Sequence, residues 1–285
     1  CSACVQVCGK GAMHMEYDAE GFAYPVIDRE KCVNCGLCRA ACPMTKDLLY
    51  PKVERVTGGY VNDREVLEKS TSGGAFTALV KAWCTGSPYA VFGAAQTEKL
   101  TTEHRYITDL SDLDMLRKSK YDQSRIGTAY ADCKRLLSEG RKVVFTGTPC
   151  QIAGLRAFLG DKEYPELLTI DVICEGVPSP KYKNSFIKYM EEKHASSVKT
   201  LDYRDKDGGR WDYNVMSLTF ENGKHITIDR WVNPFFDIWM QHIMSRPVMS
   251  AGTPLHAAAQ TSRLEICGAC IYSALSFIMT IMAPQ

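Results

Sequence analysis

Hydrophobic and polar residues follow regular periods along most of the chain, and these periods predict its elements. Continuous apolar runs at 89–95 and 143–145 are typical of strands buried inside a parallel sheet. Apolar residues at helical spacing within 75–82 predict a helix, which Ser70 or Ser72 would cap. A further strand is predicted to start at Leu167, and further helices at 125–140, 151–159 and 181–193. Strands that alternate with helices indicate an α/β domain with a mostly parallel core.

Other segments depart from this alternation. Residues 20–28 carry Gly21 within an alternating pattern and predict a short hairpin. The pair Asn222-Gly223 lies between two alternating segments and predicts a second, antiparallel hairpin. A short strand at 58–63, a helix of mixed charge at 110–118 and a helix from Asn233 complete the predicted elements.

Four closely spaced cysteines, Cys32, Cys35, Cys38 and Cys42, change this picture. They are followed by a proline and reproduce C-x2-C-x2-C-x3-C-P, the ligand run of bacterial ferredoxins that bind [4Fe–4S] clusters. In ferredoxins with two clusters, the fourth cysteine of each run binds the other cluster, so a second run is expected.

The second run is found at the start of the chain. Cys1, Cys4 and Cys8 match the last three positions of the same pattern, and the first position would precede residue 1. We therefore expect the chain to be a fragment that lacks its N-terminus. The pattern predicts one cluster on Cys32, Cys35, Cys38 and Cys8, and a second on Cys1, Cys4, Cys42 and one ligand missing from this chain.

Two other uses of the cysteines stay open. Paired C-x2-C motifs also form structural zinc sites, although three such intervals in succession suit a cluster better. A disulfide framework is the other alternative, but the 13 cysteines of the 285 residues are concentrated at ligand spacing.

The cysteines and the predicted elements divide the chain into four parts. Residues 1–45 are predicted to form a truncated two-cluster ferredoxin domain of the α+β ferredoxin-like class, and residues 46–69 a linker. Residues 70–247 are predicted to form the α/β domain, with a mostly parallel core and an antiparallel hairpin. Residues 248–285 form an atypical tail, in which Arg263 and Glu265 are the only charged side chains.

Composition excludes several classes of protein. A net charge of +1 argues against a concentrated basic face of the kind that binds nucleic acid. No apolar run reaches the roughly 18 residues that span a bilayer, so no membrane partner is expected. Oxygen-sensitive clusters and free thiols predict a reducing, cytoplasmic location.

Three loops of the larger domain are candidates for binding a ligand: Ser70–Gly74, Thr146–Gln151 and Cys174–Ser179. Ligands of open α/β sheets bind beyond the carboxyl ends of the strands, and N–H groups at a helix start attract phosphate. Taken singly, each loop is more often a simple turn.

Together the segments resemble a known family. Four of them follow the cysteine runs in this order: STSGGAFTAL, KSKYDQS, VVFTGTPCQIAGLR and VICEGVPSP. In this arrangement the chain resembles the coenzyme F420 hydrogenase/dehydrogenase beta-subunit family over about residues 1–247. The resemblance implies an iron–sulfur flavoprotein oxidoreductase. It would pass electrons between [4Fe–4S] clusters and a bound FAD, which exchanges hydride with coenzyme F420 or a similar two-electron partner.

The resemblance also implies a flavin site, but it assigns no catalytic residue. The site would be built from Ser72, Gly73, Gly74, Ser119, Lys120, Tyr121, Thr148, Pro149, Cys150 and Gln151. The positive charge of Lys120 would stabilise the reduced, anionic flavin; the alternative is that Lys120 is a solvated surface charge. The family has glycine where this chain has Lys118, which leaves the local turn uncertain.

A third [4Fe–4S] cluster is left open by the resemblance. Cys150 and Cys174 occupy two of its ligand positions, but the usual C-x2-C soon after Pro247 is missing. One hypothesis is that the tail arises from a shifted reading frame and packs poorly. The other is that it is native and that Cys267 and Cys270 supply the missing ligands.

The sequence therefore leaves three hypotheses for the function. The leading hypothesis is the flavin-containing oxidoreductase. The runner-up is a ferredoxin-type electron-transfer subunit without a substrate of its own, which docks on a redox partner protein. A degenerate protein whose clusters only stabilise its fold is a third reading.

Overall fold

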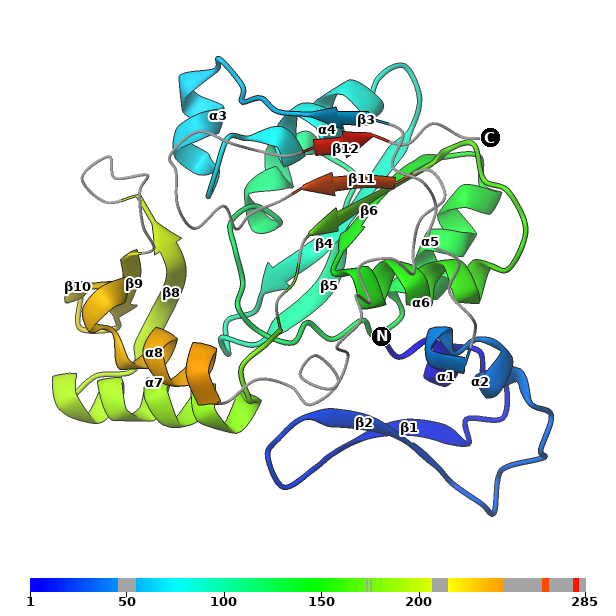
Figure 1. Ribbon diagram of the computed structural model, residues 1–285, viewed down its shortest axis with the longest axis horizontal. Coiled ribbons are helices and arrows are strands. Elements are labelled where there is room, and N and C mark those ends of the chain that lie inside the picture. The colour runs from blue at the N-terminus through cyan, green and yellow to red at the C-terminus, as the bar shows by residue number, and fades with distance from the viewer. Residues whose placement is uncertain are drawn as a thin grey trace.

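Three β-sheets organise the computed structural model, which describes residues 1–45, 55–172, 174, 176–206, 215–242, 263–266 and 279–281 (Figure 1). The first sheet belongs to the N-terminal module, the second is a seven-stranded mixed sheet, and the third has three antiparallel strands. Within these residues, no helix is both long and apolar enough to cross a lipid bilayer.

The N-terminal module is a hairpin between two short helical segments. Its elements are α1 (Ala3–Gln6), β1 (Met13–Tyr17), β2 (Ala23–Ile27), α2 (Leu37–Ala40) and the 3-10 turn η1 (Pro43–Thr45). The strands pair antiparallel, with Met13 opposite Ile27; a hairpin was predicted at 20–28, but its first strand precedes that segment. Asp18 fixes the turn, because its Oδ1 accepts hydrogen bonds from the N–H groups of Glu20 and Phe22, each at 2.9 Å.

The large sheet has the strand order β3-β12-β11-β7-β6-β4-β5. Its strands are β3 (Arg55–Thr57), β4 (Tyr89–Gln96), β5 (Thr102–Ile107), β6 (Lys142–Gly147), β7 (Leu167–Val172), β11 (Arg263–Ile266) and β12 (Met279–Ile281). Strands β4, β6, β7 and β11 pair in parallel, which agrees with the predicted core, whereas β5, β12 and β3 add antiparallel edges. Strand β11 comes from the atypical tail, while Cys267 and Cys270 lie outside the described residues.

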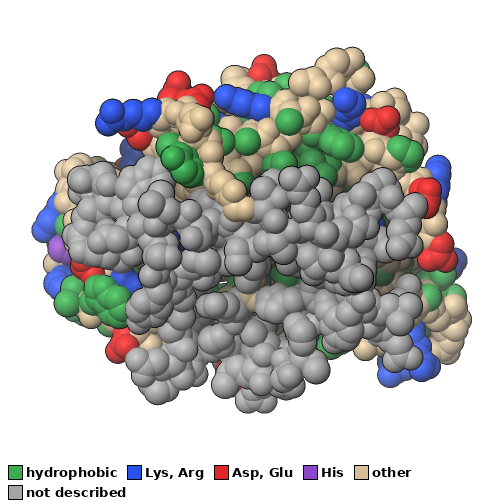
Figure 2. All heavy atoms as spheres, turned by 45° about the horizontal axis from the view of Figure 1, so that its top comes forward, with side chains coloured by type: hydrophobic (Ala, Val, Ile, Leu, Met, Phe, Trp, Pro, Cys, Tyr) green, Lys and Arg blue, Asp and Glu red, His purple; other side chains and the backbone are tan. Residues whose placement is uncertain are grey.

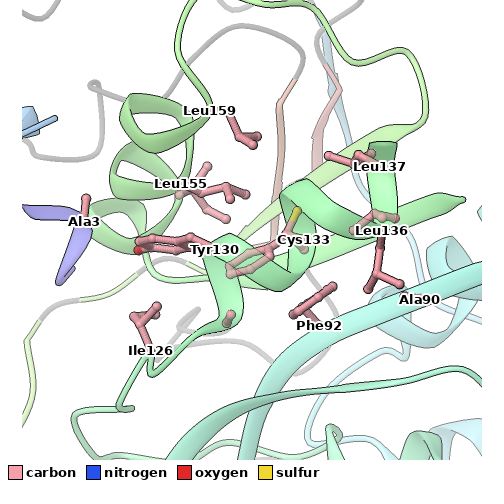
Figure 3. Packing of buried hydrophobic residues seen from close by; sticks show 14 of the residues in the cluster. Ala3, Ala90, Phe92, Ile126, Tyr130, Cys133, Leu136, Leu137, Leu155 and Leu159 are labelled. Atoms are coloured by element: carbon pink, nitrogen blue, oxygen red, sulfur yellow. The ribbon is translucent and has the colours of Figure 1, made fainter. Parts of the chain in front are cut away.

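Both faces of this sheet are covered, which explains its continuous apolar runs. On one face, Val143 and Phe145 of β6 pack with α5 (Ala129–Ser138) and α6 (Pro149–Leu159). On the other face, Val144 packs with α4 (Ala75–Trp83) and the 3-10 helix η2 (Leu110–Met115). Ala3 of the N-terminal module joins the first cluster, beside Tyr130 (Figure 3).

The third sheet has the order β10-β9-β8 and carries its own hydrophobic cluster. Its elements are α7 (Pro180–His194), β8 (Val198–Asp205), β9 (Val215–Phe220), β10 (His225–Asp229), the 3-10 turn η4 (Arg230–Val232) and α8 (Pro234–His242). The predicted hairpin at Asn222-Gly223 is confirmed. Gly223 has φ 82°, and Lys224 N donates to Asn222 Oδ1 at 3.0 Å.

Three local predictions were wrong. No strand forms at 58–63; the strand is β3, and Asp63 instead caps a short helix, α3 (Arg64–Lys69), by accepting from Val66 N. Neither Ser70 nor Ser72 caps α4, because the helix begins after Gly74 in the left-handed conformation. The segment 110–118 forms the 3-10 helix η2 rather than an α-helix.

Charges are interspersed over the surface. In Figure 2, the described Lys, Arg, Asp and Glu side chains alternate around the rim of the face shown. This distribution agrees with the net charge of +1 and provides no basic stripe on that part of the face.

Candidate functional site

The two cysteine runs adopt the same backbone conformation. Ser2 and Gly36, which follow the corresponding cysteines of each run, both have positive φ, 60° and 75°, and both precede a four-residue helix. Cys4 and Cys38 then occupy the second residue of α1 and of α2. Ser2 is not a glycine, so its left-handed backbone shows that the turn is imposed by the surroundings. The sequence repeat is therefore also a structural repeat.

Cys8 lies where backbone N–H groups surround its sulfur. Ala12 N donates to Cys8 Sγ at 3.2 Å. Desolvation opposes ionisation of this thiol, but N–H groups of Ala12, Lys10, Met13 and Gly11 together lower its pKa. A thiolate that accepts N–H···S bonds is what a cluster ligand requires, because the thiolate is the metal-binding form.

A chain of backbone hydrogen bonds connects Cys8 to the second run. Ala12, which donates to Cys8, accepts from Asp28 N at 2.8 Å, and Asp28 accepts from Cys32 N at 3.1 Å. These bonds hold the loop that begins the second run beside Cys8. This agrees with the predicted exchange of Cys8 into the cluster of Cys32, Cys35 and Cys38, which stays a prediction.

The other predicted set, Cys1, Cys4 and Cys42, lies on or next to the two short helices α1 and α2, which pack side by side (Figure 1). Burial raises the pKa of Cys4, and the charge of Cys42 raises it further. This interaction agrees with the assignment of both cysteines to one cluster, which stays a prediction.

Among the residues that the structure describes, no three His, Cys, Asp or Glu side chains lie close enough together to hold a single metal ion. A structural zinc ion binds its sulfur ligands at about 2.3 Å and so draws them close together. A four-iron cube spreads its ligands over a larger volume, so this finding concerns a single-ion site and not the cube.

Contacts at two places hold the N-terminal module against the second domain. At one end, Ala3 is fully buried against α5 and α6, and Ala131 N donates to Gln6 Oε1 at 3.1 Å. At the other end, the hairpin turn meets the start of α7, where Lys181 Nζ donates to Ala19 O at 2.7 Å and Ser179 Oγ donates to Glu20 O. The module is therefore held against α5, α6 and α7.

Two of the three segments that the resemblance assigns to the flavin site, 72–74 and 119–121, converge in the second domain. Ser119 N donates to Thr71 Oγ1 at 3.0 Å, which joins the loop of Ser72 to the loop of Lys120. Lys206, at the end of β8, donates to Leu67 O at 2.5 Å and to Ser72 O at 3.4 Å. Backbone from three distant parts of the sequence thus meets here.

Three lysines accumulate positive charge at this place. Burial lowers the pKa of Lys120 to about 8; Asp202 opposes this change and Lys118 adds to it. Burial likewise lowers the pKa of Lys206 to about 8, and Arg204 and Lys118 contribute. Neighbouring positive charges repel one another, and a bound anion would offset this repulsion. The cluster is therefore suited to an anionic ligand.

Lys118 explains the glycine of the family motif. Its φ is 67°, in the left-handed region that glycine occupies without strain, and its ammonium pairs with Asp202. The turn at Lys118 therefore forms without glycine. The lysine that replaces glycine adds a charge to the cluster.

The remaining candidate loop, Thr148–Gln151, is mostly committed to its own helix. Gln151 Oε1 accepts from Thr148 N at 2.9 Å, and Gln151 Nε2 donates to Ser124 O at 3.4 Å, so this buried glutamine serves as a helix cap. Pro149 is buried as well, whereas Cys150 is partly exposed. No hydrogen bond among the described residues joins this loop to the other two.

Tyr121 and Gly74 are also held by packing. Tyr121 makes edge contacts with Tyr203 and Phe236, at 5.6 and 5.9 Å between ring centroids. Gly74 has φ 81°, and a Cβ there would lie 2.6 Å from a methyl group of Val61. Gly74 is thus required by the backbone and by its neighbours.

Sequence reasoning missed two residues of the candidate site. Lys206 was not singled out, and the only signal for it in the sequence is the closely spaced basic residues Arg204 and Lys206. Gly154 was quoted within a motif, but its contact with Cys1 depends on the packing of two domains.

Comparisons with known proteins agree with this organisation. Residues 140–271 match the C terminus of the coenzyme F420 hydrogenase/dehydrogenase beta subunit, which confirms the resemblance and extends it past Pro247. Residues 1–46 and 24–83 each match a 4Fe-4S dicluster domain. Comparison with curated sequences finds no significant match.

One solved structure is similar in fold. It is a chain in a structure of the F420-reducing [NiFe] hydrogenase complex from Methanosarcina barkeri. The TM-score is 0.54 and the sequence identity is 18%. The alignment covers 82% of this chain and 76% of that one. At this identity the likeness establishes the shared fold.

Proposed function

We propose that this chain, which matches 4Fe-4S dicluster domains and the C terminus of the coenzyme F420 hydrogenase/dehydrogenase beta subunit, is an electron-transfer protein. It would transfer electrons between iron–sulfur clusters and a bound FAD. One cluster would be held by Cys8, Cys32, Cys35 and Cys38. The other would be held by Cys1, Cys4 and Cys42 with a further ligand. The FAD would exchange hydride with coenzyme F420 or a similar two-electron partner.

The observation that carries this proposal is the repeated cysteine turn packed into the core of the α/β domain. Ser2 and Gly36 give the two runs one backbone conformation, and Ala3 buries one run against α6. An electron carrier has to lie close to the group it reduces, and this packing fixes the distance between module and domain.

The lysine cluster supports the flavin site. Lys120 and Lys206 would bind the negative charge of the cofactor, and Ser119 and the backbone of Ser72 would orient it. A bound FAD accepts electrons singly or in pairs, so it connects one-electron clusters with hydride chemistry. The role of Lys120 in this account is to stabilise negative charge on the ring or on the phosphates.

The runner-up, an electron-transfer subunit without its own substrate, has one observation in its favour. Gln151 and Pro149, two of the ten candidate flavin residues, are buried and serve the start of α6. On this alternative the lysine cluster would receive an acidic segment of a redox partner protein. The cytoplasmic location also stays a prediction.

Anaerobic reconstitution followed by stepwise reduction separates the two functions. The protein is loaded with iron, sulfide and FAD, freed of unbound cofactor, and titrated with a one-electron donor. The proposal expects the clusters and the flavin to be reduced in one protein, with Lys120→Met weakening FAD retention. Clusters without retained flavin would support the runner-up, and a protein that takes up no electrons would contradict both.

A further inference from the structure

Gly154 occupies the interior of α6, a place where glycine makes a helix less stable than alanine does. A Cβ at this position would lie 2.8 Å from Cys1 Cβ, 3.1 Å from Cys1 Sγ and 2.8 Å from Tyr130 Oη. Carbon atoms do not approach to 2.8 Å without displacement, so the missing side chain leaves the space that Cys1 occupies.

Tyr130 forms the other wall of this space. It is fully buried, and its hydroxyl donates to Gln151 O at 2.8 Å, which fixes the oxygen beside Gly154. Its ring packs against Phe145 and Phe158, at 5.8 and 6.0 Å between centroids. Figure 3 shows the ring beside α6, with its hydroxyl oxygen directed toward Ala3. A side chain held in this way is a rigid wall.

The two cysteine runs differ in their surroundings. Ala3, next to Cys4, is buried in the core, and Gln6 accepts a hydrogen bond from α5. The equivalent loop of the second run, residues 33–37, is exposed throughout. Cys1 itself is exposed, but the residues that follow it pack against the second domain, whereas the residues around Cys35 face solvent.

We infer that Gly154 and Tyr130 form a socket that positions Cys1, and with it the cluster on Cys1, Cys4 and Cys42, against α6. This cluster is then the inner one, which exchanges electrons with the second domain, and the cluster on Cys8, Cys32, Cys35 and Cys38 is the outer one. The inference rests on the proposed function. Because contacts to the ligand sulfur affect the reduction potential, the socket also tunes the potential of the inner cluster and leaves the outer one unaffected.

The variant Gly154→Ala tests the socket, with Gly9→Ala as its control. Gly9 lies next to Cys8, and a Cβ there would meet no atom within 4 Å. Both reconstituted variants are titrated anaerobically while the reduced clusters are followed by EPR, and bound iron is counted. In Gly154→Ala, we expect one cluster signal to change its midpoint potential or to disappear with about half of the wild-type iron, since one of two [4Fe–4S] clusters is affected. In Gly9→Ala, both signals should match the wild type.

Tyr130→Phe gives a second measurement that does not require the alanine variant to fold. Removing the hydroxyl should alter the EPR line shape or the potential of the same cluster and leave the other unchanged. In the double variant, the clash with Cys1 remains although the clash with Tyr130 is gone, so the inner cluster should stay perturbed.

Two results would overturn the inference: wild-type potentials in both Gly154→Ala and Tyr130→Phe, or equal changes of both clusters. A wild-type protein that binds no iron would instead overturn the proposed function.

Discussion

Lys120 should make the affinity for FAD depend on pH. Burial lowers its pKa to about 8, from an ordinary value of 10.5, so at neutral pH the free protein holds a charge that its surroundings disfavour. The difference corresponds to roughly 3 kcal/mol at most, and to less where water reaches the ammonium group. An anionic ligand beside Lys120 would offset this penalty and raise the pKa again.

The sign of the effect follows from proton linkage. Below about pH 8, Lys120 is charged in the free and in the bound protein, so the dissociation constant for FAD should not change with pH. Above about pH 8, the free protein loses the proton and binding has to restore it. The affinity should then fall by up to about tenfold for each pH unit. Lys120→Met should bind FAD about tenfold to a hundredfold more weakly at neutral pH, the range lost with one charged hydrogen bond.

Stability of the free protein should change in the opposite direction. Between about pH 8 and 10.5, the unfolded chain binds the proton that folded Lys120 has lost, so the free energy of unfolding rises with pH. Fluorescence titration with FAD and urea unfolding, both repeated across this range, measure the two trends. Lys199→Met, which removes an exposed charge from β8, the strand that precedes Lys206, is the matched control.

A pH-independent affinity of the wild type would refute this reasoning. If Lys120→Met keeps the full pH dependence, the titrating group is Lys206, whose pKa is also about 8. The variant Lys206→Met would then abolish the dependence.

Three further changes test the fold and the ligand sets. Gly74→Ala should lower the free energy of unfolding, measured in urea, by about 2–4 kcal/mol, because Gly74 has a positive φ and a Cβ there would clash with valine methyl groups. The control Gly59→Ala, at a position with open space around it, should change this free energy by less than about 0.5 kcal/mol. Cys38→Ser should remove about half of the bound iron, while Cys84→Ser, at a buried thiol outside both cysteine runs, should retain all of it in a colorimetric iron assay. Lys183→Met should destabilise the protein by about 3–5 kcal/mol in thermal or urea unfolding, because the buried carboxylate of Asp122 would lose its counter-charge.

Patterns within one segment were sufficient to predict much of the fold. The apolar runs of β4 and β6 predicted buried parallel strands because both faces of the sheet are covered. The cysteine spacing of one run predicted the second run, and Asn222-Gly223 predicted its hairpin, because each of these signals is contained in a short stretch of sequence.

Features that depend on distant segments were missed. Strand β5 has a polar, alternating sequence, and its pairing with β4 is a tertiary choice. The residue that precedes α4 was misassigned, because a left-handed glycine, and not a serine, lies there. Lys206 and Gly154 acquire their roles only when β8 meets the loop of Ser72 and when Cys1 meets α6.

The central claim is that one chain holds both iron–sulfur clusters and a flavin. Metal, sulfide and flavin counts on the anaerobically reconstituted protein measure this most directly. The account predicts about four iron and four sulfide for each cluster, together with one FAD per chain that Lys120→Met fails to retain. Zinc in place of iron, or iron without sulfide, would contradict it.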